Sequence, residues 1–142
     1  QEVILDHGKA PRNFRRVEDA SHHAVGHNPL CGDRITIYVK AGAGVIEEIG
    51  FQGAGCAIST ASASMMTEAL KGKPVGECRE IFEAFHALLT GERDVEESAP
   101  LLGKLQVFSG VREFPIRVKC ATLAWHTLNS ALAGESEAVT TE

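Results

Sequence analysis

Apolar and polar residues alternate along the chain between residues 35 and 51, which is the pattern of β-strands with one buried and one solvated face. The sequence AGAG at 41–44 interrupts this alternation with small residues that favour a turn. We therefore predict an antiparallel hairpin over 35–51, and a further strand over 21–28 that ends at an Asn-Pro turn signal. The apolar positions of the hairpin are Ile35, Ile37, Val39, Val45, Ile49 and Phe51.

Helical spacing of apolar residues replaces this alternation in the second half of the chain. A segment rich in small residues begins after Cys56, and its apolar side chains recur on one helical face. A second helix is predicted after Pro74, and its apolar stripe includes Cys78. The last predicted helix begins at Ile116 and is ended by Gly134.

The remaining segments have weaker patterns. A short helix is predicted at 3–7, residues 91–99 are predicted to form a charged loop, and residues 100–115 form a mixed segment with a few buried leucines. Together these elements predict an α+β fold in which helices pack on a small three-stranded antiparallel sheet. A chain of 142 residues fits one domain, which we assign to 1–134, and we expect residues 135–142 to be a flexible C-terminal tail.

Composition limits the classes of partner. The 14 basic and 19 acidic residues give a formal net charge of -5 without a basic stripe, so no nucleic-acid partner is expected. The N-terminal stretch has no apolar core of signal-peptide length, and no later run approaches a membrane span, so we expect a cytoplasmic protein with no membrane partner. Under those conditions 4 cysteines favour metal or thiol chemistry over disulfides, although burial as small apolar side chains explains them equally well.

Three of the cysteines lie at junctions between predicted elements. Cys31 precedes a strand, Cys56 precedes a helix, and Cys120 lies in the opening turns of the last helix, whereas Cys78 lies in an apolar stripe. Backbone N–H groups at helix N-termini stabilise thiolates, which are the metal-binding form of cysteine. Asp33 follows Cys31 by two positions, and in extended backbone the two side chains project to the same side. Thiolates and a carboxylate together suit zinc, so these three cysteines and Asp33 are predicted to be metal ligands.

The charge of such a site needs compensation. Four anionic ligands around a divalent cation leave a formal net charge of about -2, which is unfavourable in a partly dry site. Arg117 and Lys119 stand shortly before Cys120 and can supply positive charge, although they are equally well explained as solvated charges near a helix end. The predicted ligands are dispersed along the chain with no C-x-x-C pair, and the histidines match no metal-binding motif.

Three stretches carry a resemblance to a known family, namely HHAVGHNPLCGD, GAGCAISTASASMMTEALKGK and RVKCATLAW. From about Val3 to Ala133 the chain resembles the SufU branch of the IscU/NifU-like iron–sulfur cluster assembly family. The resemblance implies a SufE/IscU-like single domain with a surface site made from Cys31, Asp33, Cys56 and Cys120. Members of the IscU branch typically have histidine directly before the third cysteine, where this chain has Lys119, and the connection at 91–115 also resembles the longer one of SufU-type members.

The resemblance implies a sulfur-relay function. SufU-like proteins hold zinc, accept persulfide sulfur from a SufS-like cysteine desulfurase, and pass it to downstream iron–sulfur assembly proteins. Such a relay stimulates the desulfurase, and whether it counts as an enzyme is partly a matter of definition. A site with one carboxylate ligand holds zinc less tightly than a site of four thiolates would, so that a ligand from the partner can displace one cysteine. Cys31 is the predicted sulfur acceptor, Cys120 is the second choice, and Arg117 is expected to steady the site or to contact the desulfurase.

Two other functions are compatible with the same residues. In the first, the protein is a scaffold whose cysteines and aspartate hold iron or a nascent [2Fe-2S] cluster, and zinc is adventitious. The lysine in place of the histidine argues against this function. In the second, zinc is structural and the protein carries no sulfur, so that Asp33→Ala would lower stability and leave sulfur transfer unchanged.

Overall fold

The structure is a computed structural model that describes residues 2–134 and 139–140. In chain order, its elements are α1 (Glu2–Lys9), β1 (His22–Asn28), β2 (Asp33–Gly42), β3 (Val45–Ala54), α2 (Ala57–Leu70), α3 (Val75–Leu89), α4 (Val95–Leu102), the 3₁₀-helix η1 (Gly103–Val111), α5 (Pro115–Ala133) and β4 (Val139–Thr140). The α+β class and the predicted hairpin are confirmed. Residues 135–138 and 141–142 of the predicted tail lie outside the described residues, and the domain assignment stays a prediction.

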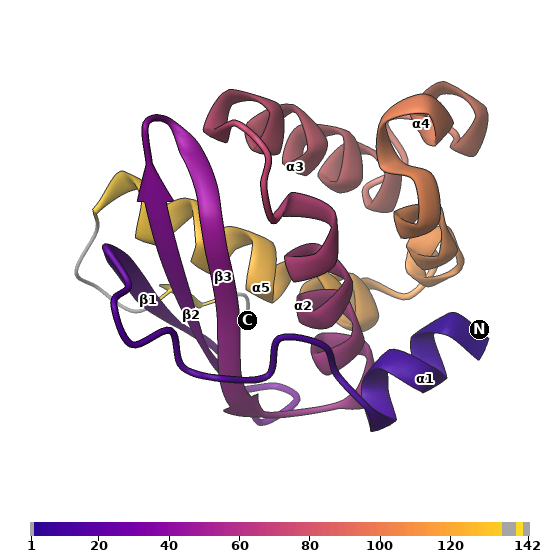
Figure 1. The fold of residues 1–142 in the computed structure, drawn as a ribbon. Helices are drawn as coiled ribbons and strands as arrows, with labels where there is room; N and C mark the ends of the chain where they lie inside the picture. The colour runs from indigo at the N-terminus through magenta and orange to yellow at the C-terminus, as the bar shows by residue number, and fades with distance from the viewer. Residues whose placement is uncertain (1, 135–138, 141–142) are drawn as a thin grey trace.

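The sheet has the strand order β3-β2-β1-β4, in which the first three strands are antiparallel as predicted. The short strand β4 adds to the outer edge of β1 in parallel orientation. In the register, Asn28 at the end of β1 pairs with Asp33 at the start of β2, and Arg34 pairs with Ala54 at the end of β3. The end of β1, the start of β2 and the end of β3 therefore meet at one end of the sheet, from which α2 begins (Figure 1).

Helices α5 and α2 form the layer that covers the sheet. α5 contacts β1 and β2, while α2 contacts β3 and lies against α5; α3 packs outside them with α4 and η1 (Figure 1). At the centre of this layer the Trp125 side chain is fully buried, stacks on Phe85 with ring centroids 4.6 Å apart, and donates a hydrogen bond of 3.1 Å to Ser62 Oγ. The small residues of α2 allow this close approach, because a large side chain would separate the two helices.

The close contact between β1 and α5 depends on a glycine. A Cβ atom placed on Gly26 would lie 1.9 Å from Thr127 Oγ1 of α5, which is far inside van der Waals contact. The absence of a side chain at this position lets β1 lie directly on the helix that carries Cys120. The strand and the helix are thus held at a separation that any side chain would increase.

The prediction of a charged loop over 91–99 is wrong, because α4 begins at Val95. The Asp94 side chain caps this helix by accepting a hydrogen bond of 2.9 Å from the backbone N–H of Glu97. Acidic side chains are favourable in the first turn of a helix, so charges that suggested a loop in fact mark a helix start. Within residues 2–134, no helix is long and apolar enough to cross a membrane.

Candidate metal centre

Asp33 forms the buried base of the centre. Its side chain is fully buried, and Oδ1 accepts a hydrogen bond of 2.7 Å from the backbone N–H of Cys56. This hydrogen bond requires glycine at position 55, because a Cβ atom on that residue would lie 2.4 Å from Asp33 Oδ1. The Asp33 carboxylate also receives a contact from the Cys56 thiol, so a backbone N–H and a thiol both hold it in place.

Cys56 lies beside this carboxylate at the beginning of α2. It is the N-cap residue of the helix, and its Sγ accepts a hydrogen bond of 3.4 Å from the backbone N–H of Ser59. Its Sγ is also 3.8 Å from Asp33 Oδ2. The Cys56 sulfur therefore lies at the N-terminal end of α2, where the Ser59 N–H fixes its direction.

Cys31 and Cys120 meet from opposite sides of the site. Their Sγ atoms are 3.1 Å apart, although 89 positions separate them in the chain. Cys120 is 2% exposed in the second turn of α5, whereas Cys31 is half-buried. The expectation that Cys31 lies in extended backbone is wrong, because it belongs to a turn in which Gly32 has a φ of 69°. This turn still places the Cys31 thiol next to Asp33 and Cys120.

The structure groups three of the four predicted ligands, and the fourth, Cys56, lies beside that group. The ligand atoms of Cys31, Asp33 and Cys120 all lie within 4.8 Å of one another, and Cys56 adjoins them through Asp33. Burial raises the pKa of Cys120, and its contacts with Cys31, Cys56 and Asp33 raise this pKa further. A divalent cation would lower the pKa of Cys120 again, because it favours the charged form of every donor. The donor set therefore fits a metal ion with affinity for sulfur.

Arg117 lies outside this group of donors. It is exposed in the first turn of α5, and its guanidinium lies over the ring of Phe114 at 4.6 Å from the ring centroid. Lys119 is half-buried next to Cys120. A role of Arg117 in sulfur transfer stays a prediction.

Asn28 is a residue of the site that the sequence reasoning missed. Its side chain is fully buried, and its Nδ2 donates a hydrogen bond of 3.6 Å to Cys120 Sγ. The sequence offered only the Asn-Pro pair, which indicates a turn and says nothing of a sulfur contact. Without the position of α5, no pattern in the sequence could place an amide beside a thiol 92 positions away.

Cys78 and the histidines are not part of this group of donors. Cys78 is 3% exposed in the core, and burial raises the pKa of its thiol to about 11. His22 contacts the hydroxyl of Ser21, and His23 stacks on Tyr38. None of these residues belongs to the group of possible metal ligands found among residues 2–134.

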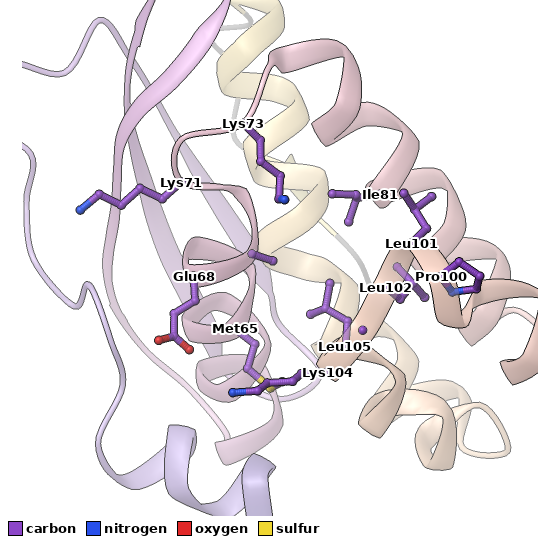
Figure 2. Close-up of a pocket in the computed structure, with 12 residues that line it drawn as sticks. Met65, Glu68, Lys71, Lys73, Ile81, Pro100, Leu101, Leu102, Lys104 and Leu105 are labelled. Atoms are coloured by element: carbon purple, nitrogen blue, oxygen red, sulfur yellow. The ribbon is translucent and has the colours of Figure 1, made fainter.

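A separate groove lies between α2 and the α4–η1 segment (Figure 2). It encloses about 490 Å³, with an apolar floor that includes Met65 and Ile81. Two of the lysines that line it have a carboxylate nearby, since Lys71 lies 3.7 Å from Glu48 and Lys73 lies 3.8 Å from Glu77. The Lys71 side chain points away from the groove in Figure 2. These contacts reduce the positive charge of two of the three lysines that line the groove, the third being Lys104.

Comparisons with known proteins identify the family and the fold of this chain. The profile described as NifU-like N terminal domain matches residues 1–121. The chain is 41% identical over 135 residues to the zinc-dependent sulfurtransferase SufU of Bacillus subtilis, covering 95% of this chain and 90% of that protein. It is 38% identical over 136 residues to the iron–sulfur cluster assembly scaffold protein IscU of Streptococcus pyogenes, covering 96% and 84%. A crystal structure titled as a putative iron–sulfur cluster assembly scaffold protein of the SUF system, from Fervidobacterium islandicum, superposes with a TM-score of 0.87 at 34% identity and covers 93% of this chain and 95% of its own.

Proposed function

Because the chain belongs to the NifU-like N-terminal domain family, we propose that it is a zinc-binding sulfur acceptor of iron–sulfur cluster assembly, supplied by a cysteine desulfurase of the SufS-like class. The observation that carries this proposal is the cluster of Cys31, Asp33 and Cys120, whose ligand atoms lie within 4.8 Å of one another. A sulfur acceptor needs reduced thiols, so this function favours a reducing compartment such as the cytoplasm.

The donor set supports zinc as the metal. Zinc is borderline-soft and takes thiolate and carboxylate ligands in a four-coordinate site, which matches Cys31, Asp33, Cys56 and Cys120. When bound, zinc keeps its cysteine ligands in the thiolate form. Asp33 would be held in its coordinating position by the N–H of Cys56, and Cys56 by the N–H of Ser59. These hydrogen bonds fix the direction of ligand atoms before a metal arrives.

Cys31 is the acceptor thiol in this proposal. It is half-buried in a turn, while Cys120 is 2% exposed, so a persulfide carried by another protein reaches Cys31 more easily. The Cys31 thiolate attacks the terminal sulfur of the donor persulfide. A sulfur–sulfur bond to Cys31 forms as the sulfur–sulfur bond of the donor breaks, and the donor cysteine leaves as a thiolate. The proton stays on the transferred sulfur, and the exchange needs no external oxidant or reductant.

The test is alanine release by a SufS-like desulfurase supplied with L-cysteine, without iron, combined with mass spectrometry of alkylated peptides. We expect the zinc-loaded parent to raise alanine release and to carry the persulfide on Cys31. Cys31→Ala should not raise alanine release, while Cys78→Ala should behave as the parent because Cys78 lies in the core. Arg117→Ala should bind zinc normally and accept sulfur more slowly. A persulfide found only on Cys56, or no stimulation by the zinc-loaded parent, would contradict the proposal.

A second candidate function is a scaffold for a [2Fe-2S] cluster on the same residues. The IscU name of the Streptococcus pyogenes relative favours it, and the thiol cluster suits iron as well as zinc. Anaerobic reconstitution with iron and sulfide, followed by transfer to an apo-ferredoxin, distinguishes the two functions. A scaffold transfers an intact cluster in this assay, whereas a sulfur acceptor does not.

A further inference from the structure

Asn28 contacts three of the four ligand-bearing residues of the centre. Its backbone carbonyl accepts a hydrogen bond of 3.3 Å from the N–H of Cys31, which closes the turn before β2. Its backbone pairs with Asp33 in the β1–β2 register. Its side-chain amide reaches across to α5 and donates to Cys120 Sγ at 3.6 Å. One residue thus connects the turn, the strand and the helix on which these ligands are carried.

Packing does not explain an amide at this position. Asn28 is fully buried, and its Oδ1 has no hydrogen-bond partner among the described residues. A buried acceptor without a partner is unfavourable, and a leucine of similar shape would fill the same space without it. The group that does find a partner is the NH₂, and that partner is a thiol. The amide is therefore explained by what its N–H does for Cys120.

We propose that Asn28 is a positioning residue that keeps Cys120 bound to the metal. Incoming sulfur is thereby directed to Cys31. The inference rests on the proposed function. An N–H that donates to a thiolate withdraws electron density from the sulfur and makes it a weaker nucleophile. Among the described hydrogen bonds, the only one that reaches Cys31 Sγ is the contact with the Cys120 thiol. The two thiols therefore differ in nucleophilicity as well as in exposure.

The first test measures zinc retention and needs no sulfur donor. Asn28→Leu keeps the shape and removes the N–H, so we expect zinc to pass to a chromophoric chelator about 10-fold to 100-fold faster than from the parent. The apo-protein should unfold at the same temperature as the parent or higher, because the unpaired Oδ1 is removed with the amide. Asn28→Asp, which places a carboxylate beside Cys120, should lose zinc faster still, and it serves if Asn28→Leu fails to fold.

Thr127→Val is the matched control. Thr127 is buried at the same contact between β1 and α5, where it faces Gly26, but it is two helical turns beyond Cys120. This variant should release zinc at the parental rate. Equal zinc release by the parent and by Asn28→Leu would overturn the proposal. Equal acceleration by Asn28→Leu and Thr127→Val would also overturn it, because the effect would then come from packing.

The second test locates the sulfur, with glutathione persulfide as the donor. In the parent we expect the label on Cys31, and in Asn28→Leu we expect the ratio of label on Cys31 to label on Cys120 to fall by about 10-fold. An unchanged ratio overturns the role of Asn28 and leaves the proposed function intact. No label on either thiol of the parent overturns the proposed function, while the zinc-release test still decides whether Asn28 holds Cys120.

Discussion

Replacement of Gly55 by alanine should open the metal centre while leaving the fold in place. The new Cβ atom would lie 2.4 Å from Asp33 Oδ1 and 3.0 Å from Asp33 Cγ. Carbon and oxygen atoms in contact are normally more than 3 Å apart, so the carboxylate must move by several tenths of an ångström or more. Its buried neighbours restrict that movement, and the displacement breaks the 2.7 Å hydrogen bond from the N–H of Cys56.

The size of the effect follows from the lost bond. A hydrogen bond to a charged group contributes about 1.5–3 kcal/mol, so we expect Gly55→Ala to lower the free energy of unfolding by about 2 kcal/mol. For a chain of this length that loss corresponds to a fall of about 5–10 °C in melting temperature. Displacement of one ligand should also weaken zinc binding by about 10-fold or more. Chelator competition measures the affinity, and calorimetry with and without zinc measures the stability.

Gly76→Ala is the matched control, because nothing lies within 4 Å of a Cβ atom placed at that position of α3. Alanine is a better helix former than glycine, so this variant should be as stable as the parent or slightly more so, with unchanged zinc affinity. Parental zinc affinity in Gly55→Ala would refute the argument that the absent side chain leaves room for the carboxylate. An equal loss of affinity in both variants would refute it as well.

The other predictions concern pH and the fourth cysteine. Burial and the charge of Arg12 hold the pKa of His7 below its ordinary 6.5, against the opposing charges of Glu68 and Asp6 and with a further contribution from Lys104. The unfolded chain therefore binds the proton more readily, so the stability due to His7 is complete above about pH 6.5 and falls at lower pH, by at most about 1.4 kcal/mol per pH unit. His7→Gln should show a shallower fall in melting temperature between about pH 7.5 and 5.5 than the parent, and identical slopes would contradict this reasoning. Because the pKa of Cys78 is raised to about 11, this thiol should resist iodoacetamide at pH 8 in the folded protein, and rapid native-state alkylation of Cys78 would show that it is accessible.

The sheet was predictable because its signals are local. The alternation of Ile35, Ile37 and Val39 with polar residues is a property of neighbouring positions, and the turn at 41–44 sets the hairpin register. Helix α4 is not predicted, because its local pattern does not distinguish a helix from a loop. An acidic stretch is typical of a solvated loop as well as of a first helical turn, and the contact that decides for a helix is the Asp94 cap, which many charged segments do not form.

The donors of the site were predictable, but their arrangement was not. Residue types and junction positions point to Cys31, Asp33, Cys56 and Cys120. The structure groups Cys31, Asp33 and Cys120 and places Cys56 beside Asp33, while their role as metal ligands stays a prediction. The turn that carries Cys31, the space that Gly55 leaves for Asp33 and the contact of Asn28 with Cys120 all depend on how α2 and α5 pack on the sheet. Such tertiary contacts join positions far apart in the chain, so a pattern of neighbouring residues does not contain them.

The 89 positions between Cys31 and Cys120 also have a consequence for the order in which the protein is made. Synthesis proceeds from the N-terminus, so Cys31, Asp33 and Cys56 leave the ribosome well before Cys120 does. A nascent chain can hold at most part of the donor set, and the centre is complete only when α5 has been made and has packed on β1. Closing a loop of this length is entropically unfavourable, and a metal that joins both ends can form all its bonds only after the sheet and α5 have come together. Full metal binding therefore follows folding and selects for chains that have completed it.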